Sequence, residues 1–212
     1  MEMKKMTLQE FADVLASDAP APGGGSVAAL CSSLSVSLSS MVYSLTIGKK
    51  FYNEYDETIQ NKMKEFQTVS NNLKNEFLDL MDVDTVAFNK VMAAFKMPKE
   101  TDEEKAVRST KIQESYIEAM EVPLSVAKKT LDIFEYLEFA ARYGNPNAAS
   151  DAGVGALLAL TALESAILNV KINLGSIKNA EIVENAAKTC EELTKAGREK
   201  KDVIMGIVES KI

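Results

Sequence analysis

Residues 19–48 read APAPGGGSVAALCSSLSVSLSSMVYSLTIG, and none of these thirty residues is charged. The prolines and glycines of 20–25 predict a loop, and Ser26 is a suitable N-cap for a helix that begins at Val27. The seven serines within 32–44 argue against a membrane span. We expect instead a buried helix whose small side chains let neighbouring helices approach closely.

The glycines that precede this helix, 23–25, allow two interpretations. One is a tight turn into a buried helix. The other is a ligand site, because glycine lets a ligand approach the backbone closely. The free N–H groups at a helix N-terminus would then attract a negatively charged or carbonyl-bearing group. The local sequence does not decide between them.

The composition excludes several classes of protein. The chain has 212 residues and a net charge of −7, which argues against a general binder of nucleic acid or of an anionic membrane. Its two cysteines form no CxxC motif, and the N-terminus lacks the apolar run of a secretory signal, so we expect a cytoplasmic protein without disulfide or zinc site. The sequence contains no histidine, which excludes Ser-His-Asp and Cys-His chemistry.

The pattern of apolar residues and caps predicts helices throughout. Capping boxes at 7–10 and 101–104 each begin a helix, and Pro123 suits the first turn of another. The expected helices cover 7–17, 26–46, 54 to the nineties, 101–120, 123–144, 148–174 and 180–208. We therefore predict an all-α, elongated antiparallel bundle of six to seven helices, formed as one domain by residues 1–212. Two of the helices are uncharged on every face over long stretches, which predicts a homodimer that covers them.

One carboxylate stands out as a candidate for catalysis. Asp84 lies four residues before Phe88, so the two share a helical face, and a buried Phe88 would bring Asp84 toward the interior. A buried carboxylate needs a partner and is a better catalytic candidate than a solvated acid. The alternative is an exposed acidic turn, which fits Asp82 better.

Three further groups of polar residues have both a structural and a functional interpretation. Lys49 and Lys50 either satisfy the last carbonyls of a helix or bind a carboxylate and supply a proton. Asn and Asp residues at 145–151 either cap helices or recognise the amide-and-amine edge of a heterocycle. Two asparagines lie four residues apart on an apolar helix and must be hydrogen-bonded, either to a neighbouring helix or to a ligand. The asparagines and aspartate in question are Asn145, Asn147, Asp151, Asn169 and Asn173.

Several separated blocks, in the same order, resemble one family over roughly residues 7–205. The family is the cyclodeaminase domain of formiminotransferase-cyclodeaminase, together with stand-alone methenyltetrahydrofolate cyclohydrolases. The matching blocks are Pro22–Ala29, Met41–Tyr52, Asp84–Phe88 with Met97–Lys99, Gly144–Ala156 and Asn169–Leu174.

The resemblance implies an all-helical homodimer that binds a folate between helices and uses neither a metal nor a redox cofactor. It also implies roles for single residues. Asp84 would be the base, and Lys50 its partner or the proton donor. Gly24, Gly25 and Ser26 would offer backbone N–H groups to an oxygen of the substrate. The other expected contacts are Asn147 and Asp151 with the pterin, Lys49 with the glutamate tail, and Asn145, Asn169 and Asn173 with the substrate.

The resemblance leaves the reaction open between two branches of the family. A chain of this length has no room for a formiminotransferase domain, which favours hydrolysis of 5,10-methenyltetrahydrofolate to 10-formyltetrahydrofolate. The alternatives are cyclisation of 5-formiminotetrahydrofolate with release of ammonia, and a non-catalytic helical dimer.

Overall fold

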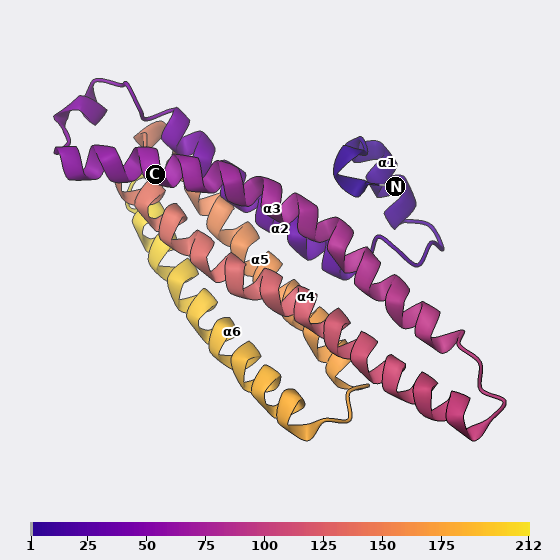
Figure 1. Ribbon diagram of the computed structural model, residues 1–212. Helices are drawn as coiled ribbons and strands as arrows, with labels where there is room; N and C mark the ends of the chain where they lie inside the picture. The colour runs from indigo at the N-terminus through magenta and orange to yellow at the C-terminus, as the bar shows by residue number, and fades with distance from the viewer. Residues whose placement is uncertain (1) are drawn as a thin grey trace.

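The computed structural model describes residues 2–212, which form six α-helices and no strand (Figure 1). The all-α prediction is therefore confirmed, as is the antiparallel arrangement of long helices. The helices are α1 (Leu8–Leu15), α2 (Gly24–Ser44), α3 (Glu57–Phe95), α4 (Asp102–Tyr143), α5 (Ala149–Leu174) and α6 (Ala180–Glu209). Three 3-10 turns, η1 (Met3–Lys5), η2 (Phe51–Glu54) and η3 (Pro146–Ala148), connect or precede them.

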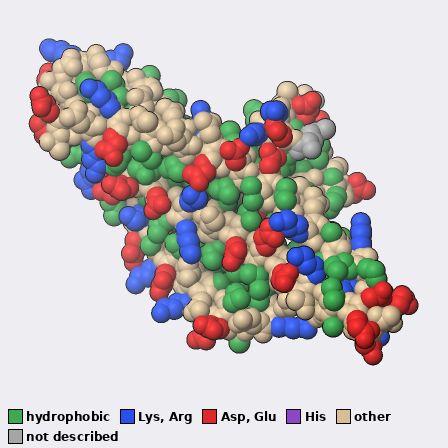
Figure 2. Space-filling model, in the orientation of Figure 1, with side chains coloured by type: hydrophobic (Ala, Val, Ile, Leu, Met, Phe, Trp, Pro, Cys, Tyr) green, Lys and Arg blue, Asp and Glu red, His purple; other side chains and the backbone are tan. Residues whose placement is uncertain are grey.

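Helices α2 to α6 form the bundle, and α1 lies beside it (Figure 1). Helix α2 packs between α3 and α5, while α4 contacts α3, α5 and α6. Helices α3 and α4 are the longest, with 39 and 42 residues, and extend well beyond the N-terminal end of α2. The face of the molecule drawn in Figure 2 carries charges of both signs among apolar side chains.

The serines of α2 explain why an uncharged helix can lie inside a bundle. Ser32 shares a hydrogen bond with Thr130 of α4 at 2.8 Å, and Ser39 one with Ser70 of α3 at 3.0 Å. Ser35 donates to the carbonyl of Gly155 in α5 at 2.8 Å. Each buried hydroxyl is thus satisfied by a neighbouring helix at close approach. The predicted role of these small residues is confirmed.

Two expectations about helix boundaries were wrong. Gly23, rather than Ser26, is the N-cap of α2, and it supplies no capping side chain. Helix α4 does not end before Pro123 but runs through it. Proline lacks the N–H that would bond the carbonyl of Ala119, four residues earlier. The side chain of Asn173 in α5 donates to that carbonyl at 3.1 Å, so the helix continues without an unsatisfied group.

Candidate active site

A cavity of about 330 Å³ lies at the N-terminal end of α2. Helices α3 and α4 extend beyond the N-terminal end of α2, and the cavity lies in the space that this leaves. Its walls come from the 20–25 loop, α2, α3, α4 and α5. They consist of Pro20, Ala21, Gly23, Gly24, Gly25, Asp84, Thr85, Phe88, Val91, Met92, Phe95, Tyr116, Ala119, Asn169, Ile172 and Asn173. Among these lining residues Asp84 is the single charged side chain.

Asp84 reaches the cavity from α3 and meets the first turn of α2. The hydroxyl of Ser26 donates to Asp84 Oδ2 at 3.1 Å, and the backbone of Ser26 donates to the same carboxylate. The carboxylate therefore satisfies a free N–H group that the N-cap glycine cannot. Burial raises the pKa of the Asp84 carboxyl, and the hydrogen bonds from Ser26 oppose this shift without cancelling it. A carboxylate in such surroundings is suited to exchange protons with a substrate.

The absence of a side chain at Gly25 is what allows this contact. A Cβ atom on Gly25 would lie 2.2 Å from Asp84 Oδ1 and 2.6 Å from its Cγ. At Gly24 the corresponding atom would lie 3.1 Å from Nδ2 of Asn169, which is tight but not prohibitive. These glycines agree with the interpretation of a tight turn into a buried helix. They allow close packing within the chain, and that packing forms the wall of a cavity.

The two asparagines of α5 line the cavity and hold its wall together. Nδ2 of Asn173 donates to the carbonyls of Ala119 and Asn169, and Nδ2 of Asn169 donates to that of Ser165. The Oδ1 atoms of both asparagines accept no hydrogen bond within residues 2–212 of the chain. Because no buried side-chain polar atom among the described residues lacks a partner, these two oxygens are accessible. These oxygens can accept hydrogen bonds from an N–H edge of a ligand. Both of the proposed roles, packing and ligand contact, are compatible with this geometry.

An aromatic wall was missed by the sequence reasoning. Phe88 and Phe95 of α3 line the cavity with Tyr116 of α4, and the rings of Phe95 and Tyr116 meet edge to face at 6.1 Å. Arg108 lies over the outer ring, Phe95, and donates to its carbonyl. The spacing of 84, 88 and 95 along one face of α3 was the signal that could have indicated this wall. Such surfaces suit a planar ring system.

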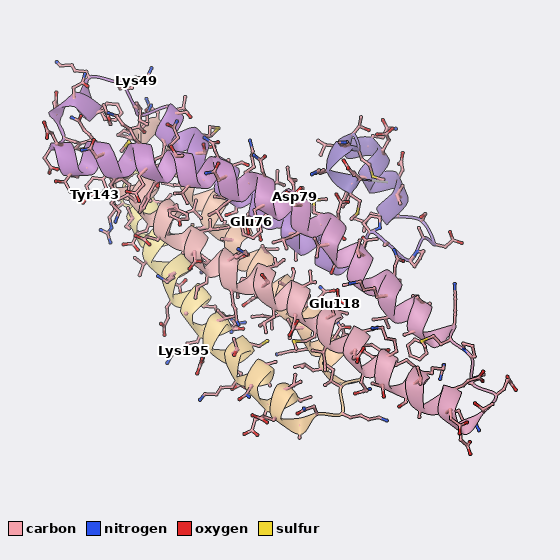
Figure 3. The ribbon with its side chains drawn as sticks, in the orientation of Figure 1. Lys49, Glu76, Asp79, Glu118, Tyr143 and Lys195 are labelled. Atoms are coloured by element: carbon pink, nitrogen blue, oxygen red, sulfur yellow. The ribbon has the colours of Figure 1, made fainter. Side chains whose placement is uncertain are left out.

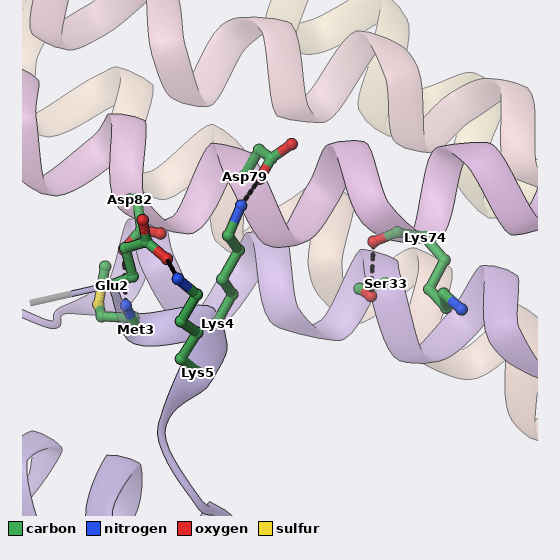
Figure 4. A network of polar contacts seen from close by, with 8 residues as sticks. All are labelled: Glu2, Met3, Lys4, Lys5, Ser33, Lys74, Asp79 and Asp82. Carbon is green, nitrogen blue, oxygen red and sulfur yellow. Dashed lines mark hydrogen bonds and ion pairs between the residues drawn. The ribbon is translucent and has the colours of Figure 1, made fainter.

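The neighbouring aspartates have a different role. Met3 donates its backbone N–H to Asp82 Oδ1 at 2.8 Å, and Lys4 pairs with Asp79 at 2.5 Å (Figure 4). Both aspartates thus hold the N-terminal turn η1 against α3 and do not line the cavity. The sequence-based preference for Asp84 over Asp82 agrees with this arrangement.

The remaining predicted site residues lie at the opposite end of α2. Lys49 and Lys50 follow its C-terminus, and α2 is about 30 Å long, so within one chain Lys50 does not meet Asp84. Figure 3 shows Lys49 at one end of the bundle, far from Asp79, which lies five residues before Asp84 on α3. The expected pairing of Lys50 with Asp84 inside one subunit is therefore wrong.

The polar turn at 145–151 lies beside these lysines and not at the cavity. Asn145 donates from its backbone to the hydroxyl of Thr46 at 2.8 Å and from its side chain to the carbonyl of Leu45 at 3.2 Å. It also caps η3 by accepting from the backbone of Asn147. Asn145 thus fits the capping interpretation. Asn147 and Asp151 lie at the same end, and within residues 2–212 their side chains form no hydrogen bond or ion pair.

The described residues 2–212 contain no group of three or more Asp, Glu or Cys side chains that could hold a metal ion. By length and composition alone, α2 and the segment Pro146–Leu174 could cross a membrane, but 61% and 50% of their apolar windows are buried in the bundle. Core helices pass the same test.

Comparisons with known proteins agree on the relatives of this chain. A methenyltetrahydrofolate cyclohydrolase of Methylorubrum extorquens is 38% identical over 97% of both chains. A formimidoyltransferase-cyclodeaminase of Rattus norvegicus is 30% identical, but the chain spans only 37% of it. The crystal structure of a formiminotetrahydrofolate cyclodeaminase from Thermotoga maritima superposes with a TM-score of 0.86 and 29% identity, covering 99% of this chain and 98% of the other.

The family model for formiminotransferase-cyclodeaminase matches residues 7–192, which include every cavity-lining residue described above. The chain therefore belongs to the formiminotransferase-cyclodeaminase family.

Proposed function

We propose that this protein hydrolyses 5,10-methenyltetrahydrofolate to 10-formyltetrahydrofolate. The observation that carries the proposal is the Asp84 carboxylate, buried among apolar and aromatic walls and held by Ser26. The likeness to the M. extorquens cyclohydrolase over nearly the whole of both chains supports it.

The substrate carries a positive charge shared between N5, N10 and the carbon that bridges them. Ionised Asp84 stabilises this cation and takes a proton from the water whose oxygen forms a bond to the bridge carbon. The adduct then loses its C–N5 bond, and protonated Asp84 returns the proton to N5. The hydroxyl proton of the adduct leaves to solvent, which completes the formyl group on N10.

The other walls of the cavity bind and orient the substrate in this proposal. Phe88 and Tyr116 pack against the planar ring, which also excludes water from the reacting carbon. The accessible Oδ1 atoms of Asn169 and Asn173 accept hydrogen bonds from the ring's N–H groups. Gly24 and Gly25 present their backbone at the N-terminal end of α2, where the helix dipole favours a negatively charged or carbonyl oxygen of the substrate.

The second candidate is the cyclodeaminase reaction, favoured by the similarity of the T. maritima structure. It would use the same carboxylate to protonate the formimino nitrogen, which leaves as ammonia after N10 has bonded to the formimino carbon. The two reactions are separated by giving the purified protein each folate in turn, and by measuring the loss of the methenyl form and the release of ammonia. We expect hydrolysis of the methenyl form and no ammonia above the blank. Ammonia from the formimino form, without hydrolysis, would overturn the proposal.

The variant Asp84→Asn tests the assigned residue in the same assay. Loss of a positioned proton-transfer group is expected to lower kcat/KM by about 100-fold or more. Its stability provides the control for folding. Because the pKa of Asp84 is raised in the folded state, its contribution to stability is greatest below its unfolded pKa and is lost as pH rises through its folded pKa. The variant should therefore be no less stable than wild type at neutral pH.

We propose further that the protein is a cytoplasmic homodimer, that it binds neither nucleic acid nor membrane, and that its reaction needs no metal or other cofactor. The reaction balances with water and protons alone. The net charge of −7 opposes polyanionic partners. A second subunit would cover the exposed apolar side chains of α2 and α5.

A further inference from the structure

The side chains expected to act together are divided between the two ends of one molecular face. At one end lies the cavity with Asp84, whose described lining contains no lysine or arginine. At the other end lie Lys49 and Lys50, on the turn that follows α2, with Asn147 in η3 and Asp151 in the first turn of α5. Both lysines are exposed, and neither forms an ion pair with another residue of 2–212. Within residues 2–212, the carboxylate at one end therefore has no cationic partner, and the two ammonium groups at the other end have no anionic partner.

The surface that joins the two ends is apolar. On α2 the outward stripe includes Leu34, which is 47% exposed, and Met41 and Leu45. On α5 the matching stripe includes Leu168 and Ile172, which are 67% and 75% exposed. The other exposed apolar members of the α5 stripe are Val154 and Leu157. The two helices pack directly on one another, so the stripes form a single face with no charged member. A continuous apolar face of this kind marks an interaction surface.

The cavity opens at the edge of this face. Ile172 belongs both to the cavity lining and to the exposed stripe of α5. Whatever covers the apolar face therefore also lies beside the mouth of the cavity.

We propose that a second copy of the chain covers this face through a two-fold axis perpendicular to α2 and α5, and that the partner subunit's Lys49 and Lys50 complete the cavity. A two-fold axis that lies in the plane of the face, perpendicular to the helices and near Leu34, buries both stripes along their whole length. It turns each end of the face onto the opposite end of the partner. The lysines, one helix length away within their own chain, are thereby placed at the cavity that contains Asp84.

Charge favours this antiparallel arrangement over a parallel one. A two-fold axis along the helices would bring Lys49 and Lys50 next to the partner subunit's Lys49 and Lys50, and like charges in contact are unfavourable. The antiparallel axis instead pairs each carboxylate cavity with a lysine end.

This inference rests on the proposed function, because it gives the lysines a role in the same site. Substrate carboxylates that extend out of a small cavity need cations at its mouth, and the chain's own lining offers none. The partner's Lys49 and Lys50 supply them, within reach of the proton exchanges at Asp84.

Heterodimers with defined lesions test the proposal. Two chains with different affinity tags are co-expressed and purified through both tags. In the first heterodimer one chain carries Asp84→Asn and the other carries Lys49→Ala with Lys50→Ala. One of its two sites is then fully native if the lysines act across the interface, so we expect about half of wild-type activity. Each parent homodimer is expected to lose about tenfold or more of its activity.

The control heterodimer carries all three substitutions on one chain and none on the other. Action across the interface predicts almost no activity here, because each site has one lesion. If the lysines act within their own chain, the first heterodimer is almost inactive and the control heterodimer has about half of wild-type activity. That result would overturn the inference. So would full activity of the homodimer that lacks both lysines.

A measurement without substrate separates this inference from the proposed function. Chains that carry Ile172→Cys are mixed with chains that carry Lys50→Cys, both with Cys31→Ser, and treated with a bifunctional maleimide much shorter than α5. We expect a covalent dimer, because the two positions face each other across the axis. If wild type hydrolyses no methenyl folate but this dimer forms, the function fails and the composite site stands. If only monomers are recovered, the composite site fails regardless of activity.

Discussion

The replacement Gly25→Ala tests how the backbone of α2 positions the carboxylate that we propose as the base, Asp84. The added Cβ would lie 2.2 Å from Asp84 Oδ1, whereas real Cβ contacts shorter than 3.0 Å essentially do not occur. The carboxylate or the first turn of α2 must therefore move by at least about 0.8 Å. Displacements of about 1 Å at reacting groups can cost roughly 100-fold in rate. That factor corresponds to about 2.7 kcal/mol of activation free energy.

The effect of Gly25→Ala on stability should be much smaller than its effect on rate. Alanine is favoured over glycine inside a helix by about 0.5–1 kcal/mol, which offsets part of the cost of about 1–3 kcal/mol for overpacking. We expect kcat to fall by about 100-fold while the fold is retained. The assay is hydrolysis of methenyltetrahydrofolate, with the unfolding transition measured in parallel.

Two further glycines provide graded controls. Gly24→Ala brings its Cβ to 3.1 Å from an asparagine amide, so a smaller loss of activity is expected. Gly206→Ala lies on α6 with nothing within 4 Å of the new atom, and it should leave activity unchanged and raise stability slightly. Wild-type activity in Gly25→Ala would show that the close approach at Gly25 does not set the position of the Asp84 carboxylate.

Three other predictions concern single interactions. Ser26→Ala removes a hydrogen bond to ionised Asp84, so the pKa of that carboxyl rises further and the acid limb of the kcat/KM–pH profile moves to higher pH; an unshifted profile would contradict the assignment. Asn173→Ala leaves a buried carbonyl of α4 unsatisfied and should lower the free energy of unfolding by about 1–3 kcal/mol. Denaturant titration would show whether Pro123→Ala, which restores the backbone donor, rescues most of that loss; equal losses in both backgrounds would count against the contact. Leu34→Glu places like charges at the proposed axis and should yield monomers in sedimentation experiments, whereas an intact dimer would exclude that axis.

The sequence allowed the helices, the capping boxes and the buried serine-rich helix to be predicted because each depends on local spacing. Asp84 could be singled out because its spacing from Phe88 placed it on an inward face. The uninterrupted course of α4 through Pro123 could not be predicted, because the group that satisfies its free carbonyl comes from Asn173, fifty residues later. Such long-range compensation leaves no local signal.

The candidate site, like the fold, could be predicted from the sequence only in part. The glycine loop and the asparagines of α5 line the same cavity as Asp84. Lys49 and Lys50 do not, because the length of α2 separates them from it within one chain. A sequence motif does not show which subunit would supply a residue to a site.

The most direct test of the central claim is the rate at which methenyltetrahydrofolate absorbance is lost with wild type, with Asp84→Asn and with a buffer blank, at equal concentrations of folded protein. If Asp84 takes the proton from water, methenyltetrahydrofolate is lost rapidly with wild type and at a rate close to the blank with the variant. Equal rates for the two proteins above the blank would show that hydrolysis does not depend on Asp84. A wild-type rate equal to the blank would contradict the proposed reaction itself.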